Sequence, residues 1–342
     1  MMSEKSCLVE VPARVDLAGG TLDLWPLYNY FGGLELVQMS IQVKARTHIV
    51  WSVSKSWDIT VESLDLRIRH RHKTRQSLTS NLELSPKDNP LRWLERLVSD
   101  ATGRYQGRPL QMHITTASDC PPGSGLGGSS VLGVSLSRAL EKSLRLKPLP
   151  PLELQTRIRD LEAIEIGYPA GEQDYIPALI PGLNVVHLSP GTKTVETLSK
   201  SLAAKLSQRL ALIYVGKPHH SGINNWAVFK ALHEGNKKTQ RSLQDIQKIS
   251  QGLASDLRQG RLDRLSEWIS AEWKARKELS PAVNAKELES AWRWGKSKGA
   301  VACKACGAGG GGTLLLVFKN QNQRDKALEA SLPSKDWFWL PV

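Results

Sequence analysis

The sequence has few cysteines and no long apolar segment, and each absence excludes a class of protein. Four of its 342 residues are cysteine, too few for a disulfide-stapled scaffold in a chain of this length. Cys303 and Cys306 have CxxC spacing, but no second pair and no nearby histidine supply the rest of a zinc site, so we expect reduced thiols. No run of 18 apolar residues occurs, so we expect no membrane-spanning helix.

The first residues also lack the apolar core of a secretory signal. Together with the reduced thiols, this predicts a cytoplasmic protein without a membrane partner. The composition, 40% hydrophobic and 23% charged, is typical of a globular protein rather than a disordered or collagenous one. The length suggests two domains or one large one, and the protein could be a monomer or a homo-oligomer.

The chain is strongly basic, with 46 Lys and Arg against 33 Asp and Glu and a net charge of +13. This balance favours anionic partners such as phosphorylated metabolites, nucleotides, nucleic acid or anionic lipid, although a basic surface also serves solubility alone. The most basic segment, residues 67–75, would place five cations on one face of a strand. It has no interleaved aromatic residues for base stacking, so we expect a solvated edge strand and no nucleic-acid partner.

Hydrophobic patterning predicts both strands and helices, with strands in both halves of the chain. The expected strands are residues 7–17, 34–51, 57–71, 109–116, 183–188, 210–215 and 313–318. The expected helices are residues 90–101, 129–143, 151–166 and most of 224–298. Residues 75–89 are expected to form a loop, and a turn-rich segment runs from the third helix to Pro181. The order predicts an α+β protein with two domains that meet near residues 180–195.

A glycine-rich segment, PPGSGLGGSS at residues 121–130, lies between an expected strand and an expected helix. Its glycines let the backbone approach an anion, and successive amides together with the helix N-terminus can bind phosphate. The hydroxyls of Ser129 and Ser130 could cap the helix, contact phosphate or bind Mg²⁺. The segment lacks the GK[ST] of a Walker loop, and no acidic residue follows at the spacing of a dinucleotide-binding fold. A purely structural turn is the alternative.

A second segment, PARVDLAGGTLD at residues 12–23, runs from an expected strand into a glycine turn. Asp23 could accept hydrogen bonds from sugar hydroxyls, and Arg14 offers a permanent cation to a phosphate or carboxylate. Asp23 is equally well explained as an ordinary turn residue.

A third segment, EAIEIGYPAGEQD at residues 162–174, begins and ends on a carboxylate. Glu162 and Asp174 lie across a turn, so that they could converge on one metal ion or one proton. Glu162 and Glu165 also suit the exposed surface of a helix.

A fourth segment has four consecutive glycines, residues 309–312, directly before an expected strand. Such a run is costly in a folded chain unless another group must come close. A second glycine loop that faces the first would complete a phosphate-binding cleft.

In their order and separations, these segments resemble the motifs of the GHMP kinases, the family of galactokinase, homoserine kinase, mevalonate kinase and phosphomevalonate kinase. RVDLAGGTLDLW and GEQDYIPALIPGLN are most similar to D-glycero-D-manno-heptose 7-phosphate kinases and related sugar kinases. The resemblance extends from about residue 10 to residue 318. It implies an α+β fold with a ribosomal-S5-like N-terminal domain, residues 1–185, and a ferredoxin-like C-terminal domain, residues 186–342.

The resemblance also implies roles for individual residues. Asp174 accepts or orients the proton of the acceptor hydroxyl with Arg14 as the catalytic cation beside it, and Ser129 and Glu162 bind Mg²⁺. The implied ATP ligands are Pro122, Gly123, Ser124, Gly125, Leu126, Gly127, Gly128, Ser129 and Ser130. The implied substrate ligands are Gly20, Thr21, Asp23, Gly171, Asp174, Gly309 and Gly310.

Four positions depart from the family pattern. Gly128 replaces the first of two serines, and Pro181 replaces a glycine. Glu172 and Tyr175 stand where heptose kinases often carry lysine and glutamine. These changes affect the prediction of which substrate is bound more than the prediction of which reaction is catalysed.

The sequence therefore predicts an enzyme, an ATP- and Mg²⁺-dependent kinase acting on a sugar or sugar phosphate, with the anomeric hydroxyl of a heptose 7-phosphate favoured. Lys217, His219 and His220 could help to bind a phosphorylated acceptor, although core or turn histidines are the alternative. Fucokinase, galactokinase or mevalonate kinase activity is the alternative within the family. Gly20 and Thr21 replace the Glu–His pair of the galactose and mevalonate enzymes, which weighs against those two. A non-catalytic sugar or nucleotide sensor, or a nucleic-acid-binding protein on the same fold, is the alternative outside it.

Overall fold

The computed structural model describes residues 4–84, 88–216, 221–279, 283, 285–307, 309 and 312–342. The chain forms two compact units. Unit 1 comprises Met1–Val11, Lys44–Asp119 and Ser129–Tyr168, and unit 2 comprises Pro12–Val43, Cys120–Gly128 and Pro169–Val342. Strands β1 (Lys5–Ala18) and β2 (Leu34–Val53) contribute residues to both units. The expected division into domains at residue 185 stays a prediction.

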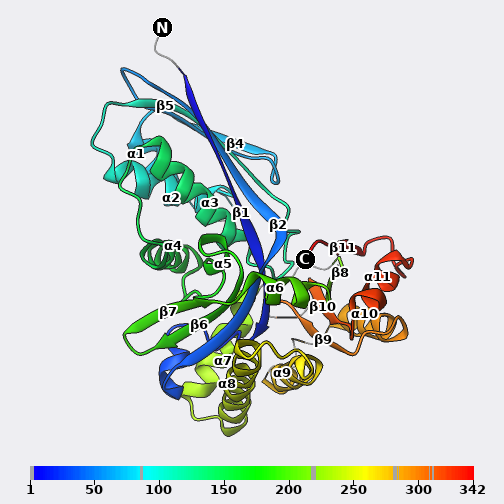
Figure 1. Cartoon of the computed structure of the whole chain (residues 1–342). Helices are drawn as coiled ribbons and strands as arrows, with labels where there is room; N and C mark the ends of the chain where they lie inside the picture. Colours follow the sequence, from blue (N-terminus) through cyan, green and yellow to red (C-terminus); the bar gives the residue numbers. More distant parts are fainter. Residues whose placement is uncertain are drawn as a thin grey trace. The chain divides into compact units, whose positions relative to one another are not determined.

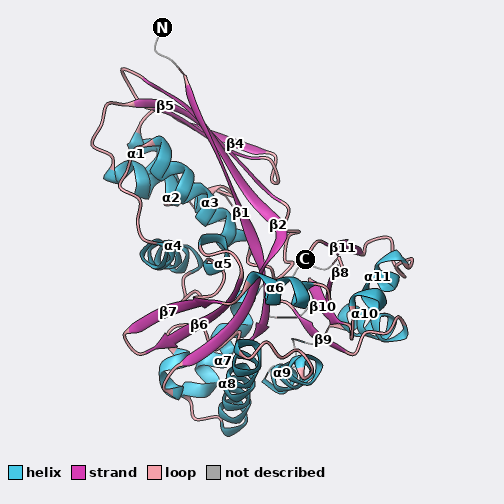
Figure 2. Ribbon diagram, viewed as in Figure 1, coloured by secondary structure: helices cyan, strands magenta, loops and turns pink. Residues whose placement is uncertain are grey.

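The sheet of unit 1 has the strand order β4-β3-β5-β2. Besides β2 it contains β3 (Asp58–Ser63), β4 (Ile68–His72) and β5 (Leu110–Ser118), drawn in magenta in Figure 2. β3 runs parallel to β5, whereas the pairs β3–β4 and β2–β5 are antiparallel. β5 alternates buried and more exposed residues, as expected for a sheet with one face on the core.

Four helices accompany this sheet in unit 1 (Figure 1). They are α1 (Arg75–Asn81), α2 (Arg92–Arg104), α3 (Gly128–Ser143) and α4 (Pro151–Ile166). α3 packs against the sheet, because the Ser135 hydroxyl donates to the Val9 carbonyl and lies 3.0 Å from the Thr47 hydroxyl. This packing fixes the start of α3, where Ser129 and Ser130 lie.

The expectation of a loop over residues 75–89 was wrong, because α1 occupies its first half. The Thr74 hydroxyl accepts a hydrogen bond from the Ser77 amide, and the Ser77 hydroxyl accepts one from the Thr74 amide. This capping box starts the helix, and the fully buried Leu78 holds it against the core. One apolar residue among polar ones gave too weak a period to reveal a helix this short.

The basic segment forms an edge strand, as expected, because β4 lies at one end of the sheet. It does not carry all five cations on one strand face: Arg67 precedes β4 with a left-handed backbone (φ 55°), and Arg75 begins α1. Arg69 pairs with Glu62 at 2.7 Å, and Arg71 pairs with Asp58 at 2.6 Å. These cations are therefore neutralised within the sheet.

Unit 2 contains two groups of antiparallel strands. In the first, β2 pairs with β6 (Leu183–Ser189), which pairs with β7 (Thr192–Thr197). The second is a four-stranded sheet of order β11-β8-β10-β9. Its strands are β8 (Leu210–Tyr214), β9 (Ala302–Ala305), β10 (Thr313–Val317) and β11 (Phe338–Leu340).

The helices of unit 2 cover apolar strand faces. They are α5 (Ile176–Leu179), α6 (Lys200–Ser207), α7 (Ser221–His233), α8 (Lys237–Arg258), α9 (Leu265–Leu279), α10 (Lys286–Ser297) and α11 (Gln321–Glu329), with a short 3-10 helix at Leu27–Phe31. One core joins α9 and α10 to the four-stranded sheet through Trp273, Leu288 and Leu316. The patterning did not predict α6, α11, β7, β9 or β11, which are short or largely polar on one side.

The expected α+β class is confirmed by this mixture of sheets and helices. Within the described ranges, no helix combines the length and the apolarity that a bilayer-crossing segment requires. Cys303 and Cys306 are free, and burial raises the pKa of each thiol to about 12. Both thiols are therefore protonated and unreactive at neutral pH.

Candidate functional site

The glycine-rich loop, Cys120–Gly128 in unit 2, has a backbone suited to binding an anion. Gly123, Gly125 and Gly127 all have positive φ, of 64°, 74° and 76°. The Ser124 amide donates to the Pro121 carbonyl at 3.0 Å. Within the described part of the chain, no group accepts a hydrogen bond from the amides of residues 125–127. Three successive amides are thus available to phosphate oxygens.

The described residues Cys306, Gly307 and Gly312 of a second glycine segment pack on this loop backbone to backbone. A Cβ on Gly312 would clash with the Gly123 carbonyl oxygen, and one on Gly125 would clash with the Cys306 carbonyl oxygen. The Thr313 amide donates to the Ser124 carbonyl at 3.1 Å. The predicted facing of two glycine segments is therefore confirmed for the residues described here.

Two of the predicted substrate ligands, Gly309 and Gly310, come from the second glycine segment of the sequence. Gly309 has a φ of 77°, and a Cβ there would clash with a methyl carbon of Val283. Gly310 lies outside the described residues, as do Lys217, His219 and His220. The roles predicted for all of them stay predictions.

Arg14 connects the loop to Asp174. Arg14 is buried on β1, and its Nε and Nη2 atoms donate to Oδ1 of Asp174 at 3.0 and 2.5 Å. Its Nη1 atom donates to the Gly125 carbonyl at 2.6 Å. Burial alone would lower the pKa of Arg14, but the carboxylates of Asp174 and Asp16 hold that pKa above its usual value. Arg14 is therefore a permanent cation at this position.

Asp174 lies beside the last residues of the loop. A Cβ on Gly127 would be 3.1 Å from Cβ of Asp174, an approach that favours glycine. The Asp174 side chain is 30% exposed. Both bonds from Arg14 reach Oδ1, and no described residue donates to Oδ2. One carboxylate oxygen is thus oriented by Arg14, and the other has no donor among the described residues.

Asp23 holds the backbone next to Asp174. Its Oδ2 atom accepts hydrogen bonds from the amides of Glu172 at 2.9 Å and Gln173 at 3.1 Å. A Cβ on Gly171 would lie 2.5 Å from the same oxygen, so this contact requires glycine. Burial, and next the charge of Asp174, raise the pKa of Asp23 to about 7. Asp23 thus positions the segment of Asp174, and its predicted contact with substrate stays a prediction.

Gly20 and Thr21 lie in the turn that precedes Asp23. A Cβ on Gly20 would clash with Oδ2 of Asp16. Thr21 is buried with a φ of 78°, a left-handed backbone that costs on the order of 1–3 kcal/mol in a branched residue. Such strain persists where surrounding contacts impose it, and it often marks a functional turn.

Sequence reasoning missed a buried ionic network below this turn. Lys304 on β9 lies 3.1 Å from Oδ2 of Asp16 and 3.0 Å from Oε1 of Glu272 on α9. Arg276 lies 3.2 Å from the same oxygen of Asp16, and its Nη2 atom donates to the Gly307 carbonyl at 2.6 Å. All four side chains are almost completely buried. A charged residue inside an otherwise apolar strand, as in RVDLAGG and ACKAC, is the signal that could have found them.

The network keeps one acid charged and disfavours the charge of the other. Burial would raise the pKa of Asp16, but Lys304 and Arg276 hold it below its ordinary value. Burial raises the pKa of Glu272, against the opposing effect of the same two cations. Asp16 is therefore the anion that holds Arg276, and through it Gly307 of the second glycine segment, in place.

The predicted metal ligands come together in unit 1. The Ser129 hydroxyl donates to Oε1 of Glu162 at 2.6 Å, and the Ser130 hydroxyl donates to Oε2 at 2.8 Å. Ser129 and Ser130 begin α3, and Glu162 lies in the last turns of α4. Hydroxyl and carboxylate oxygens are the donors that Mg²⁺ prefers, so this group fits that ion.

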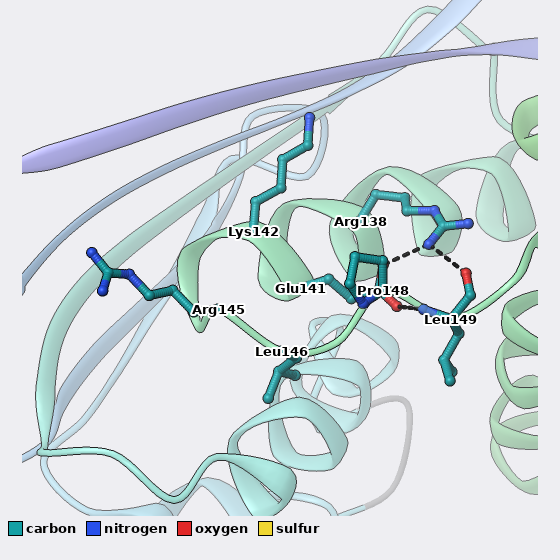
Figure 3. A pocket seen from close by; sticks show the side chains of 7 residues that line it. All are labelled: Arg138, Glu141, Lys142, Arg145, Leu146, Pro148 and Leu149. Carbon is teal, nitrogen blue, oxygen red and sulfur yellow. Dashed lines mark hydrogen bonds and ion pairs between the residues drawn. The ribbon is translucent and has the colours of Figure 1, made fainter.

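A surface hollow at the C-terminal end of α3 is lined by three cations, but it does not form an anion site. It is lined by Arg138, Glu141, Lys142, Arg145, Leu146, Pro148 and Leu149. Figure 3 shows Lys142 and Arg145 pointing away from each other. Arg138 is already bonded to Glu141 at 2.6 Å and to the Leu149 carbonyl at 2.9 Å. The three cations therefore do not converge on one ligand.

Two family models and two curated proteins match large parts of this chain. The family model for the GHMP kinase N-terminal domain matches residues 92–182, and that for the GHMP kinase C-terminal domain matches residues 253–331. A D-glycero-alpha-D-manno-heptose 7-phosphate kinase from Campylobacter jejuni is 24% identical over 329 residues, which cover 95% of this chain and 93% of that protein. A bifunctional fucokinase/GDP-fucose pyrophosphorylase from Arabidopsis thaliana is 24% identical over 91% of this chain, which spans only 30% of that protein.

The fold has solved relatives as well. The crystal structure of a D-glycero-D-manno-heptose 1-phosphate kinase from Bacteroides thetaiotaomicron is similar with a TM-score of 0.74 and 19% identity. The match covers 98% of this chain and 95% of that chain. The fold expected from the sequence is thereby confirmed, whereas the roles of single residues stay predictions.

We expect Gly312→Ala to destabilise the protein by about 2–4 kcal/mol, because its Cβ would combine backbone strain with a clash against the Gly123 carbonyl. Gly191→Ala is the matched control: Gly191 has a similar φ of 78°, but nothing lies within 4 Å of its added Cβ. It should cost only about 1–2 kcal/mol of strain. If urea unfolding shows the same loss of unfolding free energy in Gly312→Ala and Gly191→Ala, the packing of the two glycine segments is contradicted.

We expect Asp23→Asn to change how stability depends on pH. The folded protein holds a proton on Asp23 up to about pH 7, whereas the unfolded chain releases it near pH 3.8. Raising the pH from 5 to 8 should therefore lower the free energy of unfolding of the wild type by about 3 kcal/mol. The Asp23→Asn variant has no carboxyl group to titrate at this position, so it should not show this loss.

Urea unfolding at the two pH values measures this difference. Asp58→Asn is the control, because its hydrogen bonds from Arg71 hold the pKa of Asp58 below the ordinary value and keep it charged at both pH values. Its loss of stability should be the same at pH 5 and pH 8. An identical pH profile for wild type and Asp23→Asn would exclude the raised pKa.

Proposed function

Because this chain belongs to the GHMP kinase family, we propose that it transfers the γ-phosphoryl group of ATP to a hydroxyl of a sugar or sugar phosphate. The observation that carries this proposal is the ion pair of Arg14 with Asp174, beside a glycine loop with three available amides. A cation, an oriented carboxylate and phosphate-binding amides are the groups that phosphoryl transfer to a hydroxyl requires.

The loop residues 122–128 would bind the phosphates of ATP. Gly123, Gly125 and Gly127 have positive φ, and residues of alternating φ sign form the kind of concavity in which successive amides bind phosphate oxygens. The transition state of phosphoryl transfer is loose, so the protein contributes chiefly by positioning and by neutralising charge. The backbone packing of Gly312 and Gly307 against the loop keeps these amides in place before ATP binds.

Asp174 would orient the acceptor hydroxyl through Oδ2. Arg14 donates twice to Oδ1, so the carboxylate cannot rotate freely and its second oxygen has a fixed direction. The same arginine neutralises negative charge that grows as the phosphoryl group is transferred. Because a sugar hydroxyl is a very weak acid, Asp174 would accept its proton only late, as the new P–O bond forms.

Ser129 and Glu162 would hold Mg²⁺, with Ser130 beside them. When bound, the ion neutralises phosphate oxygens and aligns them for transfer. Ser129 directly follows the loop residues 122–128 in the sequence.

A heptose 7-phosphate is the substrate that we favour, with the anomeric hydroxyl as acceptor. The heptose kinase relative matches over nearly its full length, and the net charge of +13 suits a phosphorylated acceptor. Fucose is the second candidate, supported by the similarity to a portion of the longer bifunctional enzyme. ADP release with Mg²⁺–ATP, measured across hexoses, heptoses and their phosphates, separates these candidates. Release with none of them would favour a sugar or nucleotide sensor.

On the best substrate, Asp174→Asn should lower kcat by roughly 10²–10⁴-fold, because an amide orients the hydroxyl without accepting its proton. ATP affinity should change by less than about threefold, since the loop amides remain. Asp160→Asn is the control, because Asp160 is 60% exposed and pairs with its neighbour Arg159 on the surface of α4. Retained turnover in Asp174→Asn would remove this residue from catalysis.

Ser129→Ala should raise the Mg²⁺ concentration for half-maximal activity by about 10–100-fold, because a metal ligand is lost. Ser129→Thr keeps the hydroxyl and should restore most of the wild-type requirement. Titration of activity with Mg²⁺ at saturating ATP measures both variants. An unchanged requirement in Ser129→Ala would exclude Ser129 as a ligand.

A further inference from the structure

Two histidines and a glutamate form a compact group in unit 1 that the proposed reaction does not use. His70 and His72 alternate along β4, so both side chains lie on the face opposite Arg69 and Arg71. Glu95 reaches them from the first turn of α2. Nδ1 of His70 lies 2.7 Å and Nε2 of His72 lies 2.9 Å from the same oxygen, Oε1 of Glu95.

We propose that His70, His72 and Glu95 bind one Zn²⁺ ion, which ties the edge strand β4 to helix α2. The three ligand atoms lie within 4.8 Å of one another. Two imidazoles and one carboxylate are a known ligand set for tetrahedral zinc, with water in the fourth position. This site is independent of the proposed kinase activity.

The choice of zinc follows from the donor atoms. Mg²⁺ and Ca²⁺ take oxygen ligands, whereas imidazole nitrogen suits zinc and its transition-metal neighbours. At about 2.1 Å from each ligand, a tetrahedral ion separates ligand atoms by roughly 3.4 Å. The imidazoles need to move back from Oε1 by about half an ångström. His70 is 25% exposed on an edge strand and has room for this shift, whereas His72, 3% exposed, is held more firmly.

The surroundings of Glu95 support a metal site. The Glu95 side chain is fully buried, and its second oxygen, Oε2, accepts a hydrogen bond from Nδ2 of Asn89 at 2.6 Å. Asn89 is itself held, because it donates to the Asn81 carbonyl at 2.9 Å and accepts from the Leu91 amide at 3.1 Å. A carboxylate fixed by an outer hydrogen bond is the usual arrangement around a bound metal.

The test uses the full-length protein, stripped with a chelator and studied without nucleotide. Zinc chloride alone should bind at about one ion per chain in equilibrium dialysis, and it should raise the melting temperature by several degrees. Co²⁺ in place of zinc should give visible absorption bands of a tetrahedral site without the near-ultraviolet band of cysteine thiolate ligands.

His70→Gln should weaken zinc binding by at least about tenfold and abolish the rise in melting temperature. The matched control is His113→Gln, which removes a more exposed histidine that is also paired with a glutamate, at 2.7 Å from Glu62. It should bind zinc as the wild type does. If His70→Gln does not fold, His72→Gln takes its place.

Three results would overturn the proposal in favour of an imidazole–carboxylate network without metal. They are less than about half a zinc ion per wild-type chain, a thiolate band with Co²⁺, and equal zinc affinity in wild type and the histidine variant. If neither histidine variant folds, stoichiometry and the Co²⁺ spectrum of the wild type decide. Activity does not enter the test, so its outcome is separate from that of the proposed kinase function.

Discussion

Arg14 joins parts of the chain that lie far apart in sequence, and the candidate site depends on it. One guanidinium group donates to the carboxylate of Asp174, 160 residues away, and to the carbonyl of Gly125, 111 residues away. Its planar fork fixes direction as well as distance, which a lysine ammonium would not do. Arg14 is buried whereas Asp174 is 30% exposed, so loss of the Asp174 charge would leave the buried guanidinium without its counter-ion, at high cost.

A second buried ionic network, around Asp16, also holds backbone in place. Asp16 receives Lys304 and Arg276, and Arg276 in turn holds the carbonyl of Gly307. Buried ion pairs contribute little net stability, because desolvation opposes their attraction. Here they fix geometry: through Arg276 they hold Gly307 in position against the glycine-rich loop. The strain at Thr21 and the close contacts of the glycines are tolerated because these surroundings impose them.

Two polar groups of unit 1 share one arrangement, in which a carboxylate accepts hydrogen bonds from two side chains. Glu162 receives the hydroxyls of Ser129 and Ser130, and Glu95 receives His70 and His72. The donors differ in chemistry, oxygen in one group and imidazole nitrogen in the other. Hard cations prefer the first set of ligands and zinc prefers the second, so ligand type would distinguish the two proposed sites.

Local spacing along the chain was enough to predict the long periodic elements and the glycine loop, with Ser129 directly after that loop in the sequence. The sequence also pointed to Arg14, Glu162 and Asp174 as a set, through their resemblance to family motifs. Three contacts became visible only in the folded chain: the bonds of Arg14 to Oδ1 of Asp174, those of backbone amides to Asp23, and the ion pair of Lys304 with Asp16. Those contacts join residues more than 100 positions apart, and no local pattern encodes a distance that depends on how strands and helices pack.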